Sequence, residues 1–386
     1  MSAVPAWQWL LLVPVAGGSL YALLCLAALA VFRRRRRAWR TPAGPWPPVT
    51  VLKPVRGLEK GLRENLLSTC RQDWPALQVV FSFQVQDDPA LPLVLEVQRE
   101  VGAQTVDVAV VPDRREPNAK VRNLLGGLPL ARHAVLVISD SDMRLRPDYL
   151  QAIVPPLADE TVGCSCTFYR AVEAQRWWER LELLTVNADL LPNFLFAWVS
   201  GAARFVIGGS SALARSTLEA IGGLESLGDY MVEDFEMGRR LNAQGRKVVM
   251  VPYLIDTVID LASPRGFWHH QVYWDQNNRA ANGWGQFGTV VLKAVPFALL
   301  FAAARLFDPL ALAVLGATLA WRLLTSGVFL AGIGDGVGLR SLWLLPVRDM
   351  VALFSWALAF TRPVVVWRGA ELRLGANGRV VPRKPL

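Results

Sequence analysis

Residues 135–143 read VLVISDSDM, and this stretch decides the fold. It opens with four apolar residues, three of them β-branched, a pattern typical of a short strand buried on both faces. Asp140 and Asp142 follow at positions i and i+2, where the chain leaves the strand. Two such carboxylates can turn toward one hard cation, and Mg²⁺ or Mn²⁺ accepts oxygen ligands of this kind. A solvated turn is the alternative, because Asp and Ser are common turn residues.

The composition indicates a globular domain joined to membrane segments. The 386 residues are 53% hydrophobic and 19% charged, which is too apolar for an ordinary soluble domain and too charged for membrane helices alone. The net charge of +9 suits an anionic membrane surface or a polyphosphate ligand, and the long apolar runs argue against nucleic acid as the partner. The four cysteines are scattered and predict no disulfide framework; Cys164 and Cys166 are expected to be small core residues.

The first apolar segment, Trp9–Phe32, is long enough to cross a bilayer, which takes about 20 residues. The arginine run Arg33–Arg37 follows directly. A signal peptide carries its charge before the apolar run, so this segment is predicted to be an uncleaved anchor. The positive-inside rule places the arginines in the cytoplasm and the N-terminus outside. A nucleic-acid-binding patch is the alternative for the arginine run.

Apolar segments return near the C-terminus. Pro309–Ile333 and Leu342–Phe360 are predicted spans, whereas Phe287–Phe307 carries two basic residues and is predicted to be interfacial or re-entrant. The tail is basic and therefore expected in the cytoplasm, which requires an odd number of spans. Arg348 and Asp349 lie inside the last span, where ionisable residues usually pair and face a protein interior or a path.

Between residues 49 and 286, predicted strands alternate with predicted helices. The strands are Val49–Pro54, Leu77–Val85, Val106–Val111, Val135–Ser139 and Val248–Val251, and the apolar segment Leu190–Gly208 is predicted to be an interfacial or tunnel-lining helix. Alternation of this kind predicts a mostly parallel sheet with crossover helices. Ligands bind beyond the carboxyl ends of such strands.

Acidic residues lie where such a ligand would bind. Asp87 and Asp88 follow the second strand, and Asp140 and Asp142 follow the fourth. Asp234 opens a predicted amphipathic helix, where a carboxylate can serve simply as helix N-terminal charge. The functional alternative is a base that takes the proton of an acceptor hydroxyl attacking a metal-held nucleotide sugar.

Six motifs in order carry a resemblance to a known family. They are TVLKP at 50–54, DDP at 87–89, NAKVRNL at 118–124, DSD at 140–142, GSS at 209–211 and EDF at 233–235. With this set the chain, from about Val49 to the C-terminus, resembles the ceramide glucosyltransferases of glycosyltransferase family 21, which are inverting enzymes with a GT-A fold. The bacterial branch of that family includes enzymes of hopanoid glycolipid synthesis.

The resemblance implies a role for each matching residue. Asp87, Asp88, Lys120, Asn123, Asp140 and Trp274 would bind the UDP-sugar donor, with Lys120 on phosphate. Asp140 would belong to the family's metal-and-diphosphate site. Many family members have Gly where this chain has Asp142, so Asp142 as a second ligand of Mg²⁺ or Mn²⁺ is predicted from the DSD motif itself. Asp234 would be the general base in transfer of a hexose, glucose or N-acetylglucosamine, to a ceramide or hopanoid hydroxyl, giving a β-glycolipid.

The chain departs from the family at the end of the site, where family members carry Gln/Arg-x-x-Arg-Trp. Here residues 270–274 read HQVYW, so Trp274 is present but Tyr273 replaces the arginine and His270 the first residue. Tyrosine cannot supply the bidentate grip of arginine on phosphate. Arg279 is the predicted substitute. His269 and His270 are predicted to be polar residues at the site edge, with metal ligation as the alternative.

The predicted organisation is an anchor at 9–32, a basic and Pro-rich linker at 33–48, a GT-A domain at 49–286, membrane helices at 287–366 and a basic cytoplasmic tail at 367–386. The protein is expected to be multi-pass in a bacterial inner membrane, with its catalytic domain cytoplasmic. Two alternatives stay open: a processive polysaccharide synthase, and a membrane scaffold whose catalytic site has decayed.

Overall fold

The structure, a computed structural model, describes residues 6–40, 44, 46–111, 115–367 and 370–383. Part of the predicted linker lies outside the described residues, as do Arg368 and Gly369 of the predicted tail. The chain forms two compact units. The helical unit comprises Met1–Arg34, Glu173–Ser200 and Leu261–Val365, and the sheet unit comprises Arg35–Val172, Gly201–Asp260 and Val366–Leu386.

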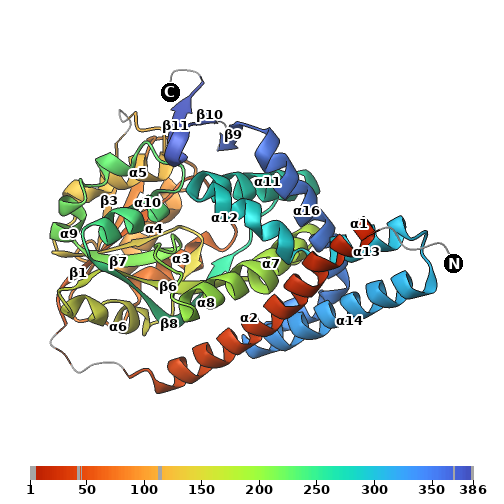
Figure 1. The fold of residues 1–386 in the computed structure, drawn as a ribbon. Coiled ribbons are helices and arrows are strands. Elements are labelled where there is room, and N and C mark those ends of the chain that lie inside the picture. Colours follow the sequence, from red (N-terminus) through yellow and green to blue (C-terminus); the bar gives the residue numbers. More distant parts are fainter. Residues whose placement is uncertain (1–5, 41–43, 45, 112–114, 368–369, 384–386) are drawn as a thin grey trace. The chain divides into compact units, whose positions relative to one another are not determined.

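The sheet unit is built on a mixed sheet whose described strands run in the order β3-β2-β1-β4-β7-β6-β8-β5 (Figure 1). The strands are β1 Val49–Pro54, β2 Leu77–Phe83, β3 Val106–Val110, β4 Val135–Ser139, β5 Met143–Arg144, β6 Val162–Val172, β7 Ser210–Ala214 and β8 Lys247–Val258. Neighbours are parallel from β3 through β4 and between β6 and β8, whereas β7 and β5 run antiparallel to their neighbours. The expected parallel arrangement is confirmed for β3-β2-β1-β4 and for the β6–β8 pair, and antiparallel β7 lies between these two groups.

The central strands are apolar on both faces because helices cover the sheet. Val51, Phe81 and Val137 are fully buried in one hydrophobic core. The helices of this unit are α3 Leu62–Cys70, α4 Leu91–Val101, α5 Ala119–Gly127, α6 Tyr149–Ile153, α9 Arg215–Ala220 and α10 Glu233–Ala243. Because β1, β2 and β4 are parallel, their carboxyl ends meet at one edge, as the sequence predicts for the two acidic clusters.

Two helix boundaries differ from expectation for local reasons. The helical spacing of Leu62, Leu66 and Leu67 predicts a helix over Leu58–Cys70, but α3 begins only at Leu62, because Gly57 and Gly61 both have positive φ and interrupt the helix start. The apolar segment expected as one helix over Leu190–Gly208 is a π-helix, Val186–Leu190, followed by α8 (Leu191–Val199). Helical structure ends there, and Gly201 has a φ of +76°.

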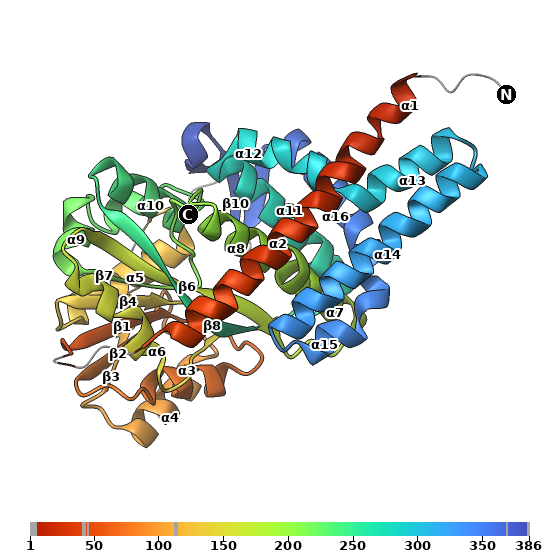
Figure 2. The same cartoon turned by 60° about the horizontal axis from the view of Figure 1, so that its bottom comes forward.

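The helical unit contains three described helices that are long and apolar enough to cross a membrane: Trp7–Ala38, Pro309–Gly332 and Leu342–Thr361. They match the three predicted spans, although the first continues through the arginine run instead of ending at Phe32. The segments Gly283–Leu292 and Ala294–Ala304 bend by 56°, as in a broken span or a re-entrant loop. Trp321 Nε1 donates to the carbonyl of Ser19 at 3.1 Å, which joins α14 to α2 (Figure 2).

The helices of this unit are α1 Ala6–Leu10, α2 Leu12–Ala38, α7 Trp177–Thr185, α8, α11 Pro264–Ala281, α12 Gly283–Gly288, α13 Ala294–Ala304, α14 Pro309–Gly332, α15 Gly336–Arg340 and α16 Leu345–Thr361. Two parts of the predicted GT-A domain therefore belong to the helical unit, namely residues 173–200 and 261–286. Contacts explain the grouping, since Gln276 donates to the carbonyl of Arg362 and Arg348 donates to Thr185.

The C-terminal segment, expected as a basic tail, contains β-strands: β9 Val364–Trp367, β10 Ala370–Leu374 and β11 Val380–Pro382. Val380 N–H donates to the carbonyl of Asp229 at 2.7 Å, and Met231 N–H donates to the carbonyl of Gly378 at 3.0 Å. The guanidinium groups of Arg240 and Arg379 each lie over the Tyr230 ring, 5.5 Å from its centroid. This segment thereby fastens residues 229–231, just before α10.

Val380→Pro is expected to loosen that loop, because proline removes the N–H that binds Asp229. Hydrogen–deuterium exchange should show faster exchange of the Met231 amide and of the first turn of α10. Val381→Ala, which changes an exposed side chain in the same strand, is the control. Unchanged protection of Met231 in Val380→Pro would contradict this role of the segment.

Candidate functional site

A buried lysine supports the turn that follows β4. Lys53 ends β1, next to β4, and its side chain is fully buried. Its Nζ donates to the carbonyls of Asp140 at 2.7 Å and Met143 at 3.2 Å. Burial lowers the pKa of Lys53 to about 8. Lys53 lies within the TVLKP motif, but nothing in the motif predicts these contacts, because only the parallel pairing of β1 and β4 brings Lys53 close to the turn.

A second lysine joins three segments. Lys120, in the first turn of α5, lies 2.7 Å from Asp140 Oδ1 and 2.9 Å from Glu233 Oε1, and it donates to the carbonyl of Gly208 at 3.2 Å. Burial alone would lower the pKa of Lys120, but the two carboxylates hold it well above its usual value. In turn, Lys120 outweighs burial and lowers the pKa of Glu233. Of the predicted site residues, Lys120 and Asp140 are thus brought into direct contact.

Asn118 holds the two helix starts of this cluster together. Its side-chain oxygen accepts from the amides of Lys120 and Val121, which caps α5. Its Nδ2 donates to the carbonyl of Tyr230 at 2.8 Å and to Glu233 Oε2 at 3.0 Å. Asn118 and Glu233 were quoted as parts of motifs, yet neither was a predicted site residue, because only the fold shows that the two helix starts meet.

Asp234 lies beside the cluster, at the start of α10. A Cβ placed on Gly208 would clash with Asp234 Oδ2, so the backbone before β7 comes as close to this carboxylate as a glycine permits. Burial, followed by the charge of Glu233, raises the pKa of Asp234 to about 7. A carboxylate with this pKa can exchange a proton near neutral pH, as a general base requires.

One carboxylate oxygen of Asp142 has no hydrogen-bond partner among the described residues. Its Oδ2 accepts from the Thr257 hydroxyl at 2.9 Å, whereas its buried Oδ1 has no hydrogen-bond partner in the described part of the chain. Burial raises the pKa of Asp142, and it raises the pKa of Asp140 to about 6. An unpaired buried carboxylate oxygen is costly unless something binds it, so the pair fits a cation.

The number of ligands limits how that cation would be held. The described residues contain no group of three His, Cys, Asp or Glu side chains that could hold a metal. Asp140 Oδ1 is already paired with Lys120. A cation at Asp140 and Asp142 would therefore need most of its ligands from a phosphate ligand and water, which is the usual arrangement for Mg²⁺.

Two predicted donor-binding residues position the loop after β1. Asp88 is buried, and its carboxylate accepts from the backbone amides of Gly57 at 2.9 Å and Ala90 at 2.9 Å. Asn123 is buried as well and donates to the carbonyl of Val55 at 3.0 Å. Asp87 is exposed. The contacts of Asp88 and Asn123 are with the protein's own backbone, and their contact with a donor stays a prediction.

The remaining predicted residues belong to α11 of the helical unit. Arg279 Nη2 lies 3.4 Å from the carbonyl of Arg362. The His270 ring centroid is 5.0 Å from that of Trp274, and His270 Nδ1 is 2.8 Å from Glu182 Oε1. His270 is thus held by a carboxylate. The parts of Trp274 and Arg279 in donor binding stay predictions.

Similar proteins agree with this architecture. A mannosyltransferase from Pyrobaculum calidifontis, solved in complex with GDP-Man and Mn²⁺, is 19% identical with a TM-score of 0.50, over 89% of this chain and 98% of that one. This likeness concerns the fold alone and confirms the expected GT-A type.

Sequence relatives point to one family. Ceramide glucosyltransferase 1 of Caenorhabditis elegans is 25% identical over 53% of this chain and 44% of its own length. A ceramide glucosyltransferase of Pyricularia oryzae is 29% identical over 33% of this chain and 31% of its own length. These matches span less than half of either relative. The family model described as glycosyl transferase family 21 matches residues 10–380, and the chain therefore belongs to glycosyl transferase family 21.

Proposed function

We propose that the protein is a membrane-bound inverting glycosyltransferase. It moves a hexose, glucose or N-acetylglucosamine, from a UDP-sugar to the hydroxyl of a lipid acceptor, a ceramide or hopanoid, and yields a β-glycolipid. The observation that carries the proposal is the position of Asp234, whose carboxylate lies against Gly208 beside the Lys120 cluster at the carboxyl edge of the sheet. The names of the ceramide glucosyltransferase relatives support a lipid acceptor.

In this mechanism, ionised Asp234 accepts the proton of the acceptor hydroxyl as its oxygen attacks the anomeric carbon. The bond from that carbon to the diphosphate breaks on the opposite face, which inverts the configuration. Lys120, paired with Asp140 and Glu233, lies within reach to place positive charge near the leaving phosphates. A divalent cation at Asp140 and Asp142 would neutralise charge on the leaving diphosphate.

The proposed location is a bacterial inner membrane with the sheet unit in the cytoplasm. Arg33–Arg37 lie in the last turns of the first candidate span. The positive-inside rule assigns such a run to the cytoplasmic side. The sheet unit begins at Arg35, directly within this run, and nucleotide sugars are cytoplasmic substrates in this proposal.

Incubation of the full chain in lipid nanodiscs with radiolabelled UDP-glucose or UDP-N-acetylglucosamine and with ceramide or hopanoid tests the proposal. A single labelled glycolipid is the expected product. A labelled polymer would instead identify a polysaccharide synthase. No product from any pairing would contradict transfer and favour a non-catalytic scaffold.

Asp234→Asn is expected to lower the transfer rate by about 10²–10⁴-fold while donor affinity stays near normal, because it removes only the proton acceptor. The wild-type rate should fall as the pH drops below about 7, since protonated Asp234 cannot act as a base. Asp229→Asn, an exposed carboxylate in the preceding loop, is the control. A rate in Asp234→Asn equal to wild type would exclude Asp234 as the base.

Asp142→Asn is expected to weaken Mn²⁺ binding by at least about tenfold, because the amide keeps the Thr257 contact but loses the charge that a cation requires. Titration of Mn²⁺ in the presence of UDP, followed by electron paramagnetic resonance, measures this affinity. Asp159→Asn, at an exposed turn, should bind Mn²⁺ as wild type does. Equal affinities in both variants would rule out a metal ligand at Asp142.

Arg279→Ala is expected to reduce UDP-sugar affinity by about tenfold, if Arg279 replaces the family arginine on the diphosphate. Equilibrium binding of the UDP-sugar gives the measurement. Arg265→Ala, in the first turn of the same helix, provides a matched loss of charge. Near-normal donor affinity in Arg279→Ala would show that another group holds the diphosphate.

A further inference from the structure

The helical unit contains a partly open cavity of about 170 Å³, with both polar and apolar side chains in its lining. The three candidate spans, α2, α14 and α16, all contribute to its wall, together with the π-helix, α11 and the bent segment around Lys293. A polar cavity among such helices is unusual, because charged side chains at membrane depth are costly unless they face a protein interior or a substrate path.

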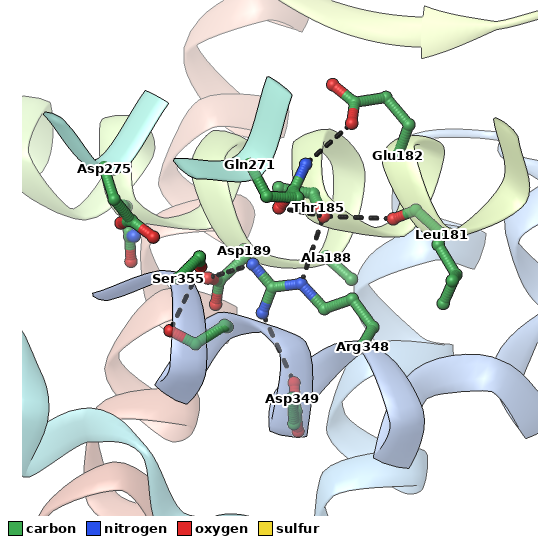
Figure 3. A network of polar contacts seen from close by, with 12 residues as sticks. Leu181, Glu182, Thr185, Ala188, Asp189, Gln271, Asp275, Arg348, Asp349 and Ser355 are labelled. Atoms are coloured by element: carbon green, nitrogen blue, oxygen red, sulfur yellow. Dashed lines mark hydrogen bonds and ion pairs between the residues drawn. The ribbon is translucent and has the colours of Figure 1, made fainter. Parts of the chain in front are cut away.

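One wall of the cavity is a fixed network of ion pairs. Arg322 binds Asp349 through two contacts of 2.9 and 3.0 Å. Arg348 lies 2.6 Å from Asp189 and 3.3 Å from Asp349, and its Nε donates to Thr185 at 3.2 Å (Figure 3). Arg348 and Asp349 thus form the paired set that the sequence predicts for the last span. The network joins α7, the π-helix, α14 and α16, so these charges are satisfied by one another.

Two polar groups on the cavity wall lack such partners. Ser326 is 4% exposed, and its Oγ has no hydrogen bond within the described residues, although serines on helices can bond to a preceding carbonyl. The half-buried side chain of Lys293 has no direct hydrogen bond or ion pair with a described residue, although the charges of the Asp189 and Asp275 carboxylates act on it. A buried polar atom without a partner is destabilising, so Ser326 in particular calls for a ligand or water.

The charges on the wall define the class of that ligand. The charged lining residues are three bases, Lys293, Arg322 and Arg348, and three acids, Asp189, Asp275 and Asp349, which cancel in formal charge. An anionic head would find no net attraction there. An uncharged head with hydroxyl and amide groups can both donate and accept, and so can satisfy Ser326 and Lys293.

The ligand would also need an apolar part. The same helices expose large apolar side chains outward, including Leu20 and Leu24 on α2 and Leu324 and Val328 on α14. These surfaces are suited to hydrocarbon, so a molecule whose head enters the cavity between the spans can leave its chains among lipid tails.

We propose that this cavity binds the uncharged head of a lipid that carries hydroxyl and amide groups, with Ser326 and Lys293 as hydrogen-bond partners. The choice of this lipid class rests on the proposed function, which requires an acceptor of this chemistry. The binding itself needs no sugar transfer, and therefore it can be tested separately.

The experiment uses the full chain with the Asp234→Asn substitution in nanodiscs, without a sugar donor, and a ceramide with a diazirine beside its amide. Photolabelling should map to the cavity-facing residues of α2 and α14. Ser326→Leu, which fills the cavity, and Lys293→Met, which removes a partner without adding bulk, should each reduce this labelling by about five- to tenfold. Leu324→Phe, on the exposed face of α14, is the matched control and should leave labelling unchanged.

Labelling spread over the outer helix faces and unaffected by Ser326→Leu and Lys293→Met would overturn the inference, as would stronger labelling of the cavity by a photoreactive phosphatidylglycerol. If Ser326→Leu does not yield folded protein, Lys293→Met alone decides between these outcomes. Glycolipid formation by the wild type without labelling of the cavity would reject this site but not the proposed function. Labelling of the cavity in a protein that makes no glycolipid would support this site and contradict the proposed function.

Discussion

The arrangement of the candidate site depends on one ammonium group shared by two carboxylates. Lys120 lies within 2.9 Å of both Asp140 and Glu233, which come from the turn after β4 and from the start of α10. Since all three side chains are half-buried, their charges interact more strongly than they would in water. Loss of Lys120 would leave two neighbouring carboxylates without their common counter-ion, close to Asp234 as well.

The backbone around this cluster has little freedom. Lys53 donates to the carbonyl of Asp140 in the turn after β4, and Asn118 joins the start of α5 to the start of α10. Gly208 lets the chain before β7 approach Asp234. The C-terminal strand β11 holds the loop before α10 from another direction. Asp234 is therefore positioned by elements that are remote in sequence, and such rigidity is what placing a base against a substrate requires.

In the helical unit, too, charged side chains are neutralised by ion pairs. Arg322, Arg348, Asp189 and Asp349 neutralise one another within helices that are otherwise apolar. Such pairs contribute little net stability, because the cost of removing the charges from water offsets most of their attraction. They lie beside a cavity in which Ser326 Oγ has no hydrogen-bond partner among the described residues.

The sequence by itself determined the elements and the chemistry. Periodicity and residue type reflect local structure and burial. They were therefore enough to predict the apolar run before Asp140, the alternation of strands and helices, the three candidate spans and the candidate base at Asp234. Family membership followed from the order of six short motifs, whose spacing the chain preserves.

Only the tertiary structure decided which residues meet. Local sequence could not indicate that Lys53 contacts the turn after β4 or that Lys120 pairs with Asp140 and Glu233. Nor could it indicate that Asp88 accepts from the amides of Gly57 and Ala90, or that the C-terminal segment folds against the loop at 229–231. The physical reason is that such contacts depend on strand order and on pairings between residues far apart in the chain, and side-chain periodicity carries no information about either.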